Sequence, residues 1–396
     1  MNESTFTPGG GQPGGQGPAG LQAVGSVAVR TFAARQSGYQ GTSRSPQQTP
    51  TQTAHQSMDG HHVNAMAGDR SGDTHSHFAD YDELSPEGHF YDPDAEYEPD
   101  PEYAATLAPD AARQRRERVG PTGRPLPYFP IPGPLTDHGP AKIIAMCNQK
   151  GGVGKTTSTI NLGAALAEYG RRVLLVDFDP QGALSVGLGV NPMELDLTVY
   201  NLLMERGMSA DEVLLKTAVP NMDLLPSNID LSAAEVQLVS EVARESTLQR
   251  ALKPLMDDYD YIVIDCQPSL GLLTVNALTA AHKVIVPLEC EFFALRGVAL
   301  LTETIEKVQE RLNPELELDG ILATMYDSRT VHSREVLARV VEAFDDHVYH
   351  TVIGRTVRFP ETTVAGEPIT TYASNSVGAA AYRQLAREVL ARCHAE

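Results

Sequence analysis

A glycine-rich segment flanked by lysines contains the residue types best suited to bind phosphate. Residues 150–157 read KGGVGKTT. Glycines let backbone N–H groups converge on phosphate oxygens, because a Cβ would block the approach. Lys155 can reach the β- and γ-phosphates of a nucleotide, and the Thr156 hydroxyl can ligate Mg²⁺. The predicted nucleotide-binding residues of this segment are Lys150, Gly151, Gly152, Val153, Gly154, Lys155, Thr156 and Thr157.

One departure from the usual pattern of such loops is informative. Gln149 stands where the first glycine is expected, and Lys150 follows it directly. The alternative interpretation is a glycine-rich turn that binds nothing. A Gly-Lys-Thr sequence between a strand and a helix, with acidic strand ends downstream, favours the nucleotide site. A helix that begins near Thr156 adds a favourable dipole for an anion.

Two aspartates are predicted to complete the site. Asp179 ends the run RVLLVDFD, and Asp265 ends the run YIVID. Such residues are often helix caps or turn residues, but here each follows an apolar strand on the phosphate side. We expect Asp265 to make an outer-sphere contact with Mg²⁺ and Asp179 to orient the attacking water. Asp177 is expected to be structural.

These expectations define the chemistry of the site. ATP and Mg²⁺ are the predicted cofactors, and hydrolysis of ATP to ADP and phosphate is the predicted reaction. Lys155 and Asp179 are the expected catalytic residues, and Pro268 of the VIDCQP segment is expected to contact the nucleotide together with Asp265. The expected metal-site residues are Thr156, Asp179 and Asp265.

The elements that must position these residues alternate between strands and helices from residue 142 to the end. Apolar strands separated by helices indicate an α/β fold, a mostly parallel twisted sheet covered by helices on both faces. Ligands of such sheets bind beyond the carboxyl ends of the strands. Strands are expected at residues 142–148, 172–179, 261–266, 283–288 and 318–325. Helices are expected at about residues 156–169, 231–241, 246–256, 270–280, 293–312, 332–344 and 378–393.

The chain divides into a tail, residues 1–141, and a domain, residues 142–396. The tail is rich in Gly, Pro, Gln, Ser and His without apolar periodicity, so it is expected to be disordered. It carries 17 acidic and 9 basic residues, a net charge of −8, which leaves −12 of the total −20 for the domain. An acidic block at 80–102 and a basic stretch at 113–118 are interpreted as solvated linker or, alternatively, as a partner-docking segment. A Pro-rich connector follows at 121–140.

Cysteine usage and hydrophobicity argue against several classes of protein. The four cysteines lie far apart without a CxxC pair, unlike those of a disulfide framework, a zinc site or an iron–sulfur site. No secretory leader and no run of about 20 apolar residues is present, so the cytoplasm is the expected location. The final helix has one apolar face, which predicts packing on its own domain rather than on a membrane. That face comprises Tyr382, Leu385, Ala386, Val389 and Leu390.

As a set, these motifs resemble the ParA/Soj family of chromosome- and plasmid-partitioning ATPases, a deviant P-loop group that includes MinD-like proteins. The likeness covers about residues 142–392 and leaves the tail outside. The motifs that carry it are NQKGGVGKTT (148–157), LLVDFDPQG (174–182), YDYIVIDCQPSLGLLTVNAL (259–278), VIVPLECEFFALRG (284–297) and TMYDSRT (324–330).

The resemblance implies a mechanism for the whole molecule. Lys150 matches the family's signature lysine, which reaches across a sandwich homodimer to the partner's phosphates, so it becomes an expected catalytic residue. ATP would join two subunits and hydrolysis would separate them. The implied partners are non-specific DNA and a ParB-like stimulating protein, without a membrane, and the implied location is the nucleoid. From the sequence alone, Lys150 could be an ordinary exposed loop lysine, and only the resemblance favours its action across the dimer.

Three arginines match positions at which the family holds DNA. The alternative is that they are solvated or pair with Glu361 and Glu367. The chain also departs from the family pattern, because Glu367 replaces a lysine, and Asn375 and Val377 replace arginines. Each lost cation removes a potential phosphate contact, so weak and salt-sensitive DNA binding is expected. The three arginines are Arg329, Arg355 and Arg358.

A function of another class stays open beside partitioning. An ATP-switched regulatory or scaffold protein could position a partner, in a MinD-like way or for the condensation machinery, without binding DNA itself. The acidic domain and the long tail favour this alternative. A DNA-binding assay with and without ATP would separate the two.

Overall fold

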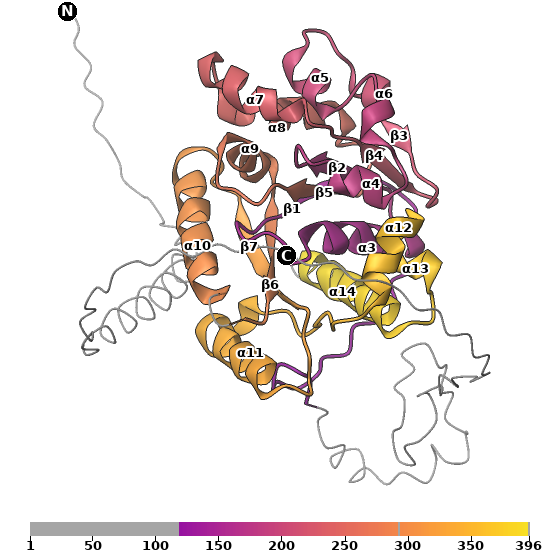
Figure 1. Ribbon diagram of the computed structural model, residues 1–396, viewed down its shortest axis with the longest axis vertical. Coiled ribbons are helices and arrows are strands. Elements are labelled where there is room, and N and C mark those ends of the chain that lie inside the picture. Colours follow the sequence, from indigo (N-terminus) through magenta and orange to yellow (C-terminus); the bar gives the residue numbers. More distant parts are fainter. Residues whose placement is uncertain (1–118, 292–293, 395–396) are drawn as a thin grey trace, which may run out of the picture. The chain divides into compact units, whose positions relative to one another are not determined.

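A seven-stranded sheet runs through the domain (Figure 1). The structure is a computed structural model that describes residues 119–291 and 294–394. The strand order is β3-β4-β2-β5-β1-β6-β7, and all neighbouring strands are parallel except β3 and β4. The strands are β1 (Lys142–Met146), β2 (Val173–Phe178), β3 (Leu215–Lys216), β4 (Met222–Leu225), β5 (Tyr261–Cys266), β6 (Lys283–Glu289) and β7 (Glu317–Thr324).

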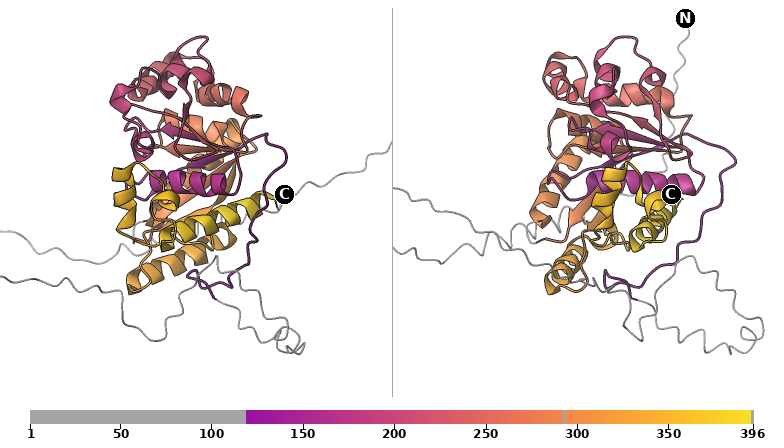
Figure 2. Two further views of the ribbon diagram at one scale, coloured as in Figure 1. Left: turned by 90° about the vertical axis from the view of Figure 1, so that its right-hand side faces the viewer. Right: turned by 45° about the vertical axis from the view of Figure 1, so that its right-hand side comes forward.

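Helices cover both faces of the sheet, which confirms the predicted fold class (Figures 1 and 2). One face carries α3 (Lys155–Glu168), α4 (Ala183–Gly187), α12 (Arg358–Ala365), α13 (Ile369–Tyr372) and α14 (Val377–His394). The other carries α5 (Val199–Met204), α6 (Ala210–Val213), α7 (Leu231–Gln237), α8 (Thr247–Leu252), α9 (Leu272–Ala280), α10 (Ala294–Arg311) and α11 (Val331–Phe344). Short 3-10 helices are η2 (Pro192–Glu194), η3 (Leu238–Ser240), η4 (Arg244–Ser246), η5 (Lys253–Leu255) and η6 (Asp345–His347).

The inner strands are apolar along most of their length because both faces are covered. Leu175 of β2 and Val263 of β5 belong to the core layer of α3 and α14, and the residues next to them belong to the opposite layer. Side chains alternate along a strand. Asp177 and Asp265, two positions further on, therefore face the α3 side at the carboxyl ends of their strands.

Most of the expected elements are present. The five expected strands are β1, β2, β5, β6 and β7, each within two residues of the expected bounds. The helices expected at 231–241 and 246–256 are shorter, because each continues as a 3-10 helix after α7 and α8. Sequence analysis missed β3 and β4, which have two and four residues. Runs of that length are too short to show a period.

The last helix packs on its own domain, as predicted. All five apolar side chains of its expected face are buried against the layer that contains α3. Among the described helices, none combines the length and apolar character that crossing a membrane requires. The buried residues are Tyr382, Leu385, Ala386, Val389 and Leu390.

Residues 119–141, here called the N-terminal arm, run along the amino ends of the strands as an extended segment (Figure 2). At one end of the arm, the Arg124 guanidinium donates to the carbonyl oxygen of Asp345 at 2.8 Å. At the other end, His138 Nδ1 lies 2.8 Å from the Oδ2 atom of Asp260, which directly precedes β5. Polar contacts therefore hold the arm against the domain at both ends.

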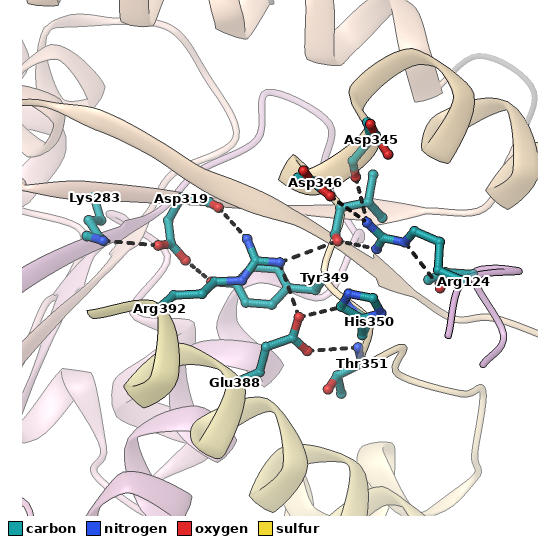
Figure 3. A network of polar contacts seen from close by, with 12 residues as sticks. Arg124, Lys283, Asp319, Asp345, Asp346, Tyr349, His350, Thr351, Glu388 and Arg392 are labelled. Carbon is teal, nitrogen blue, oxygen red and sulfur yellow. Dashed lines mark hydrogen bonds and ion pairs between the residues drawn. The ribbon is translucent and has the colours of Figure 1, made fainter. Parts of the chain in front are cut away.

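Arg124 joins a network of polar contacts that includes the last helix (Figure 3). Arg124 and Arg392 both donate to the carbonyl oxygen of Val348. The Arg392 guanidinium also lies over the Tyr349 ring, 4.1 Å from its centroid. Glu388 has no solvent exposure; it accepts from Arg392 at 3.1 Å and from two backbone N–H groups at 2.8 and 2.9 Å. These bonds satisfy the carboxylate, which would otherwise be costly to bury.

The contacts of the arm differ from the expectation that the whole tail to residue 141 is disordered. Residues 119–141 pack on the domain, through polar anchors that apolar periodicity does not reveal. The expectations for residues 1–118, including the acidic block and the basic stretch, lie outside the described residues.

Two truncations should separate the arm from the rest of the tail. Deletion of residues 1–118 should leave the melting temperature unchanged, whereas deletion of residues 1–141 should lower it. The longer deletion removes the hydrogen bonds of Arg124. It also removes the contacts of His138 and the Gly139 N–H with Asp260. Together these losses should lower the free energy of unfolding by about 2 kcal/mol. For a domain of this size that loss corresponds to a shift of roughly 4–8 °C by calorimetry. Equal melting temperatures for the two deletions would show that the arm does not stabilise the fold.

Candidate nucleotide-binding site

The glycine-rich loop lies between β1 and α3. Gly152 and Gly154 have φ angles of 75° and 83°, in the left-handed region that a side chain makes costly. Gly154 is the N-cap of α3, so the loop leads directly into the first turn of a 14-residue helix. Backbone N–H groups without helical partners and the helix dipole favour an anion at this point.

Side chains that sequence analysis did not single out tie the loop to neighbouring strands. Asn148 Nδ2 donates to the carbonyl oxygen of Pro287 at 2.7 Å, and its Oδ1 accepts from the N–H of Lys150 at 2.9 Å. Thr324 Oγ1 donates to the carbonyl oxygen of Val153 at 2.9 Å. The sequence signal for both is a polar residue at the carboxyl end of an expected strand.

Lys155, the first residue of α3, turns its side chain back over the loop. The residue is only 7% exposed, and its Nζ donates to the carbonyl oxygen of Lys150 at 3.3 Å. An ammonium group has three donors. Lys155 therefore keeps the capacity to donate to phosphate oxygens in the loop.

Two buried carboxylates lie side by side near the first turn of α3. The pairing of β2 with β5 places Asp177 opposite Asp265, and both residues are 0% exposed. Thr156 Oγ1 donates to Asp265 Oδ2 at 2.7 Å. The N–H and hydroxyl of Ser185 donate to Asp177 Oδ2 at 2.8 and 2.7 Å. Each carboxylate is thus held by a different helix.

The two carboxylates have raised pKa values. Burial and, second, the charge of Asp177 raise the pKa of Asp265 to about 8. Burial raises the pKa of Asp177 to about 6, although the hydrogen bonds from Ser185 lower it in part. Two like charges away from water are costly unless a cation lies close to them.

The donor atoms at this point fit Mg²⁺. Oδ1 of Asp265 is buried and makes no hydrogen bond within the described part of the chain. Hydroxyl and carboxylate oxygens are the protein ligands that Mg²⁺ prefers, and a divalent cation would offset the charges of both aspartates. The structure brings the predicted Thr156 and Asp265 together and adds Asp177, which was expected only to be structural.

Asp179 lies in the loop that follows β2, because the strand ends at Phe178. Its Oδ1 accepts from the N–H of Gln181 at 2.9 Å, a turn typical of aspartate. Its own N–H lies 3.4 Å from Asp177 Oδ1. The expected roles of Asp179 in orienting water and in the metal site stay predictions.

Lys150 turns away from the loop. Its Nζ lies 2.9 Å from Glu289 Oε2 and 2.6 Å from Glu291 Oε2, and its side chain is 42% exposed. Sequence analysis missed both glutamates, although two carboxylates at the end of a predicted strand were a usable signal. Pro268 lies beside the loop, since a Cβ built on Gly151 would be 4.0 Å from the Pro268 Cβ.

The three arginines expected to hold DNA each face a carboxylate. Arg329 is the most exposed, with 88% of its side chain accessible. The interpretation that such arginines pair with nearby acids holds for Arg358 and Glu361. Arg355 pairs with Glu289, which also contacts Lys150. The pairs are Arg329 with Asp327 at 2.9 Å, Arg355 with Glu289 at 3.6 Å and Arg358 with Glu361 at 3.0 Å.

A mostly parallel sheet, a glycine loop that opens a helix, and a threonine–aspartate pair beside it define a P-loop nucleotide hydrolase. Comparison with known proteins indicates the same class. A family model described as an AAA domain matches residues 141–318. An uncharacterized protein of Mycobacterium tuberculosis is 69% identical over 274 residues, which cover 69% of this chain and 86% of that protein.

Two further relatives carry more specific descriptions. The chromosome-partitioning ATPase Soj of Treponema pallidum is 49% identical over 251 residues, 63% of this chain and 98% of the relative. A Mycobacterium smegmatis protein described as cobyrinic acid a,c-diamide synthase, solved with an ATP analog and magnesium, is 46% identical. It superposes with a TM-score of 0.57 and covers 64% of this chain and 96% of its own.

The chain belongs to the ParA/Soj/MinD family of ATPases. This membership confirms the resemblance found in the sequence and the predicted enzyme class, an ATP hydrolase. The predicted cofactors, ATP and Mg²⁺, match what the M. smegmatis structure holds, an ATP analog with magnesium.

Substitution of the loop lysine tests the nucleotide site. Lys155→Ala should weaken ATP binding by about 100-fold, because losing a charge-assisted contact costs about 3 kcal/mol. Isothermal titration with MgATP measures the effect, and Lys253→Ala, which removes an exposed lysine elsewhere, is the matched control. Wild-type affinity in Lys155→Ala would move the phosphate site away from this loop.

Proposed function

We propose that this protein is an ATP-switched, dimerising ATPase of chromosome or plasmid partitioning that binds DNA without sequence preference in its ATP-bound dimer. The observation that carries the proposal is that the two lysines of the KGGVGKTT segment differ in burial and in where their side chains point. Lys155 is buried, and its side chain folds back over the glycine-rich loop. Lys150 is part-exposed, and its side chain points away from the loop toward Glu289. These positions support a role for Lys155 at the chain's own nucleotide and a role for Lys150 at the nucleotide of a partner subunit.

The residues beside the loop have distinct proposed roles. Lys155 and the loop N–H groups bind the phosphates, and Thr156 and Asp265 hold Mg²⁺, which neutralises charge on the β- and γ-phosphates when bound. Asp179 orients the attacking water. Lys150 stabilises the transferring charge from the partner subunit. The M. smegmatis relative, with its bound ATP analog and magnesium, supports ATP and Mg²⁺ as the ligands.

An exposed apolar row near the site supports a dimer. Val236, Val239 and Val242 have exposures of 75%, 59% and 89% and lie in or just after α7 and η3. Gln267, just beyond β5, donates to Glu235 of α7 at 3.1 Å, so the start of this row lies at the carboxyl edge of the sheet. Clustered exposed apolar residues mark interaction surfaces. A second copy paired across this edge would cover them.

Two observations support DNA binding by this protein. The Treponema pallidum relative is a chromosome-partitioning ATPase, and Arg329 and Arg358 remain 88% and 55% exposed despite their carboxylate neighbours. Exposed ion pairs are weak, so phosphate groups can compete for these arginines. A ParB-like protein that stimulates hydrolysis, and a cytoplasmic, nucleoid-associated location, complete the proposal.

The second candidate is an ATP-switched scaffold that positions a partner without binding DNA. Two observations favour it, namely the carboxylate beside each of the three arginines and the acidic domain with its net charge of −12. Both reduce the attraction of a phosphate backbone. The DNA experiment below decides between the candidates.

Asp179→Ala should retain ATP and hydrolyse it at least about 100-fold more slowly, because only the water-orienting group is lost. Dimer should then accumulate with MgATP in sedimentation runs. Phosphate release measures turnover, and Asp196→Ala provides a control with an exposed aspartate elsewhere. Unchanged turnover would remove Asp179 from the mechanism.

The trapped dimer of Asp179→Ala allows a direct test of DNA binding. With MgATP at low salt it should bind random-sequence duplex DNA, and without ATP it should not. Adding Arg358→Glu should weaken binding and reduce the slope of log affinity against log salt by about 1 for each lost contact. Arg206→Glu, the same charge change on another exposed loop, should have a smaller effect.

Two other results of this experiment are informative. A trapped dimer that ignores DNA would favour the scaffold function over partitioning. Binding that Arg358→Glu does not weaken would place the DNA surface elsewhere.

A further inference from the structure

Four charged residues form a cluster at the carboxyl edge of the sheet, beside the phosphate loop. Glu289 lies between two cations, 2.9 Å from the Nζ of Lys150 and 3.6 Å from the guanidinium of Arg355. Glu291 lies 2.6 Å from the same Nζ. The proposed reaction uses Lys150 but assigns no role to either glutamate.

The two glutamates differ in how firmly they are placed. Glu289 is the last residue of β6, and its side chain is only 14% exposed. Glu291 lies two residues further on, and its side chain is 54% exposed. Glu289 is thus a fixed anchor, which Arg355 helps to hold, and Glu291 is a second, more accessible contact for the same ammonium group.

The charges of the cluster reinforce one another. Partial burial lowers the pKa of Lys150, but the hydrogen bonds with Glu291 and Glu289 outweigh it, so the pKa lies above its usual value. The hydrogen bond from Lys150 is the main reason that the pKa of Glu291 lies below its usual value. Both groups are therefore charged near neutral pH, and the ammonium group is attracted to its own subunit.

This attraction opposes the proposed contact of Lys150 with the phosphates of a partner subunit. An ammonium group bonded to two carboxylates of its own chain must leave at least one of them before it can contact a phosphate of another chain. The phosphates of the partner therefore compete with Glu289 and Glu291 for one cation. The weaker the intramolecular contacts are, the less nucleotide is needed for the subunits to pair.

We propose that Glu289 and Glu291 are positioning residues that hold Lys150 on its own subunit and so set the ATP concentration at which two subunits pair. The inference rests on the proposed action of Lys150 across the dimer. It adds a threshold to that action: the same two glutamates that restrain the lysine also prevent pairing at low occupancy of the site.

The test measures the MgATP concentration that gives half-maximal dimer, by sedimentation velocity with the full chain carrying Asp179→Ala to prevent turnover. Adding Glu291→Gln should lower this concentration about two- to fivefold, as expected for a partly exposed ion pair. Adding Glu289→Gln as well should lower it further. Glu303→Gln, an exposed glutamate of α10, removes the same charge elsewhere and should leave the concentration unchanged.

A Lys150→Ala background shows whether the effect passes through the lysine. In that background, measured at high protein concentration, Glu291→Gln should no longer change the self-association constant with MgATP. A persisting effect would overturn the proposal, as would an unchanged or higher ATP requirement when Lys150 is present. Dimerisation of Lys150→Ala at wild-type ATP would instead contradict the action of Lys150 across the dimer, so the two failures are distinguishable.

Discussion

Asp177 and Asp265 lie opposite each other on neighbouring strands, and neither is exposed to solvent. Two carboxylates in that position repel each other, and burial makes their charge more costly. The surrounding elements offset part of this cost: α4 supplies the hydrogen bonds of Ser185 and α3 supplies the hydroxyl of Thr156. A divalent cation would offset the remainder. The aspartate pair thus links β2 and β5 to the first turns of α3 and α4, next to the loop that opens α3.

The carboxyl ends and the amino ends of the strands contact different parts of the chain. Buried carboxylates and charged loops gather at the carboxyl edge, where Lys155 turns back over the glycine-rich loop and Lys150 turns toward Glu289. The N-terminal arm is anchored at the amino edge, through Arg124 and through the contact of His138 with Asp260. The arm therefore does not cover the carboxyl edge, where the candidate nucleotide site lies. Separating attachment from chemistry in this way follows from the parallel direction of the strands.

Local patterns in the sequence were sufficient for the fold class, the five longer strands, the position of the glycine-rich loop between a strand and a helix, and the packing of α14. Each depends on residues that are close together in the chain. A glycine loop followed by Lys155 and Thr156 is a phosphate site in any strand–loop–helix unit. An apolar face that repeats with helical period shows that a helix is buried, as α14 is by Tyr382 and Leu385.

Tertiary structure alone decided which of these elements become neighbours. Alternation along β2 and β5 indicates which face Asp177 and Asp265 share, but only the strand order puts them side by side. The same holds for Glu289, which meets Lys150 because β6 lies next to β1, and for Arg355, which joins that cluster through Glu289. The repeat of apolar residues along a helix or strand indicates which way each side chain points within that element. Strand neighbours are set by crossover connections and long-range packing, which leave no local pattern.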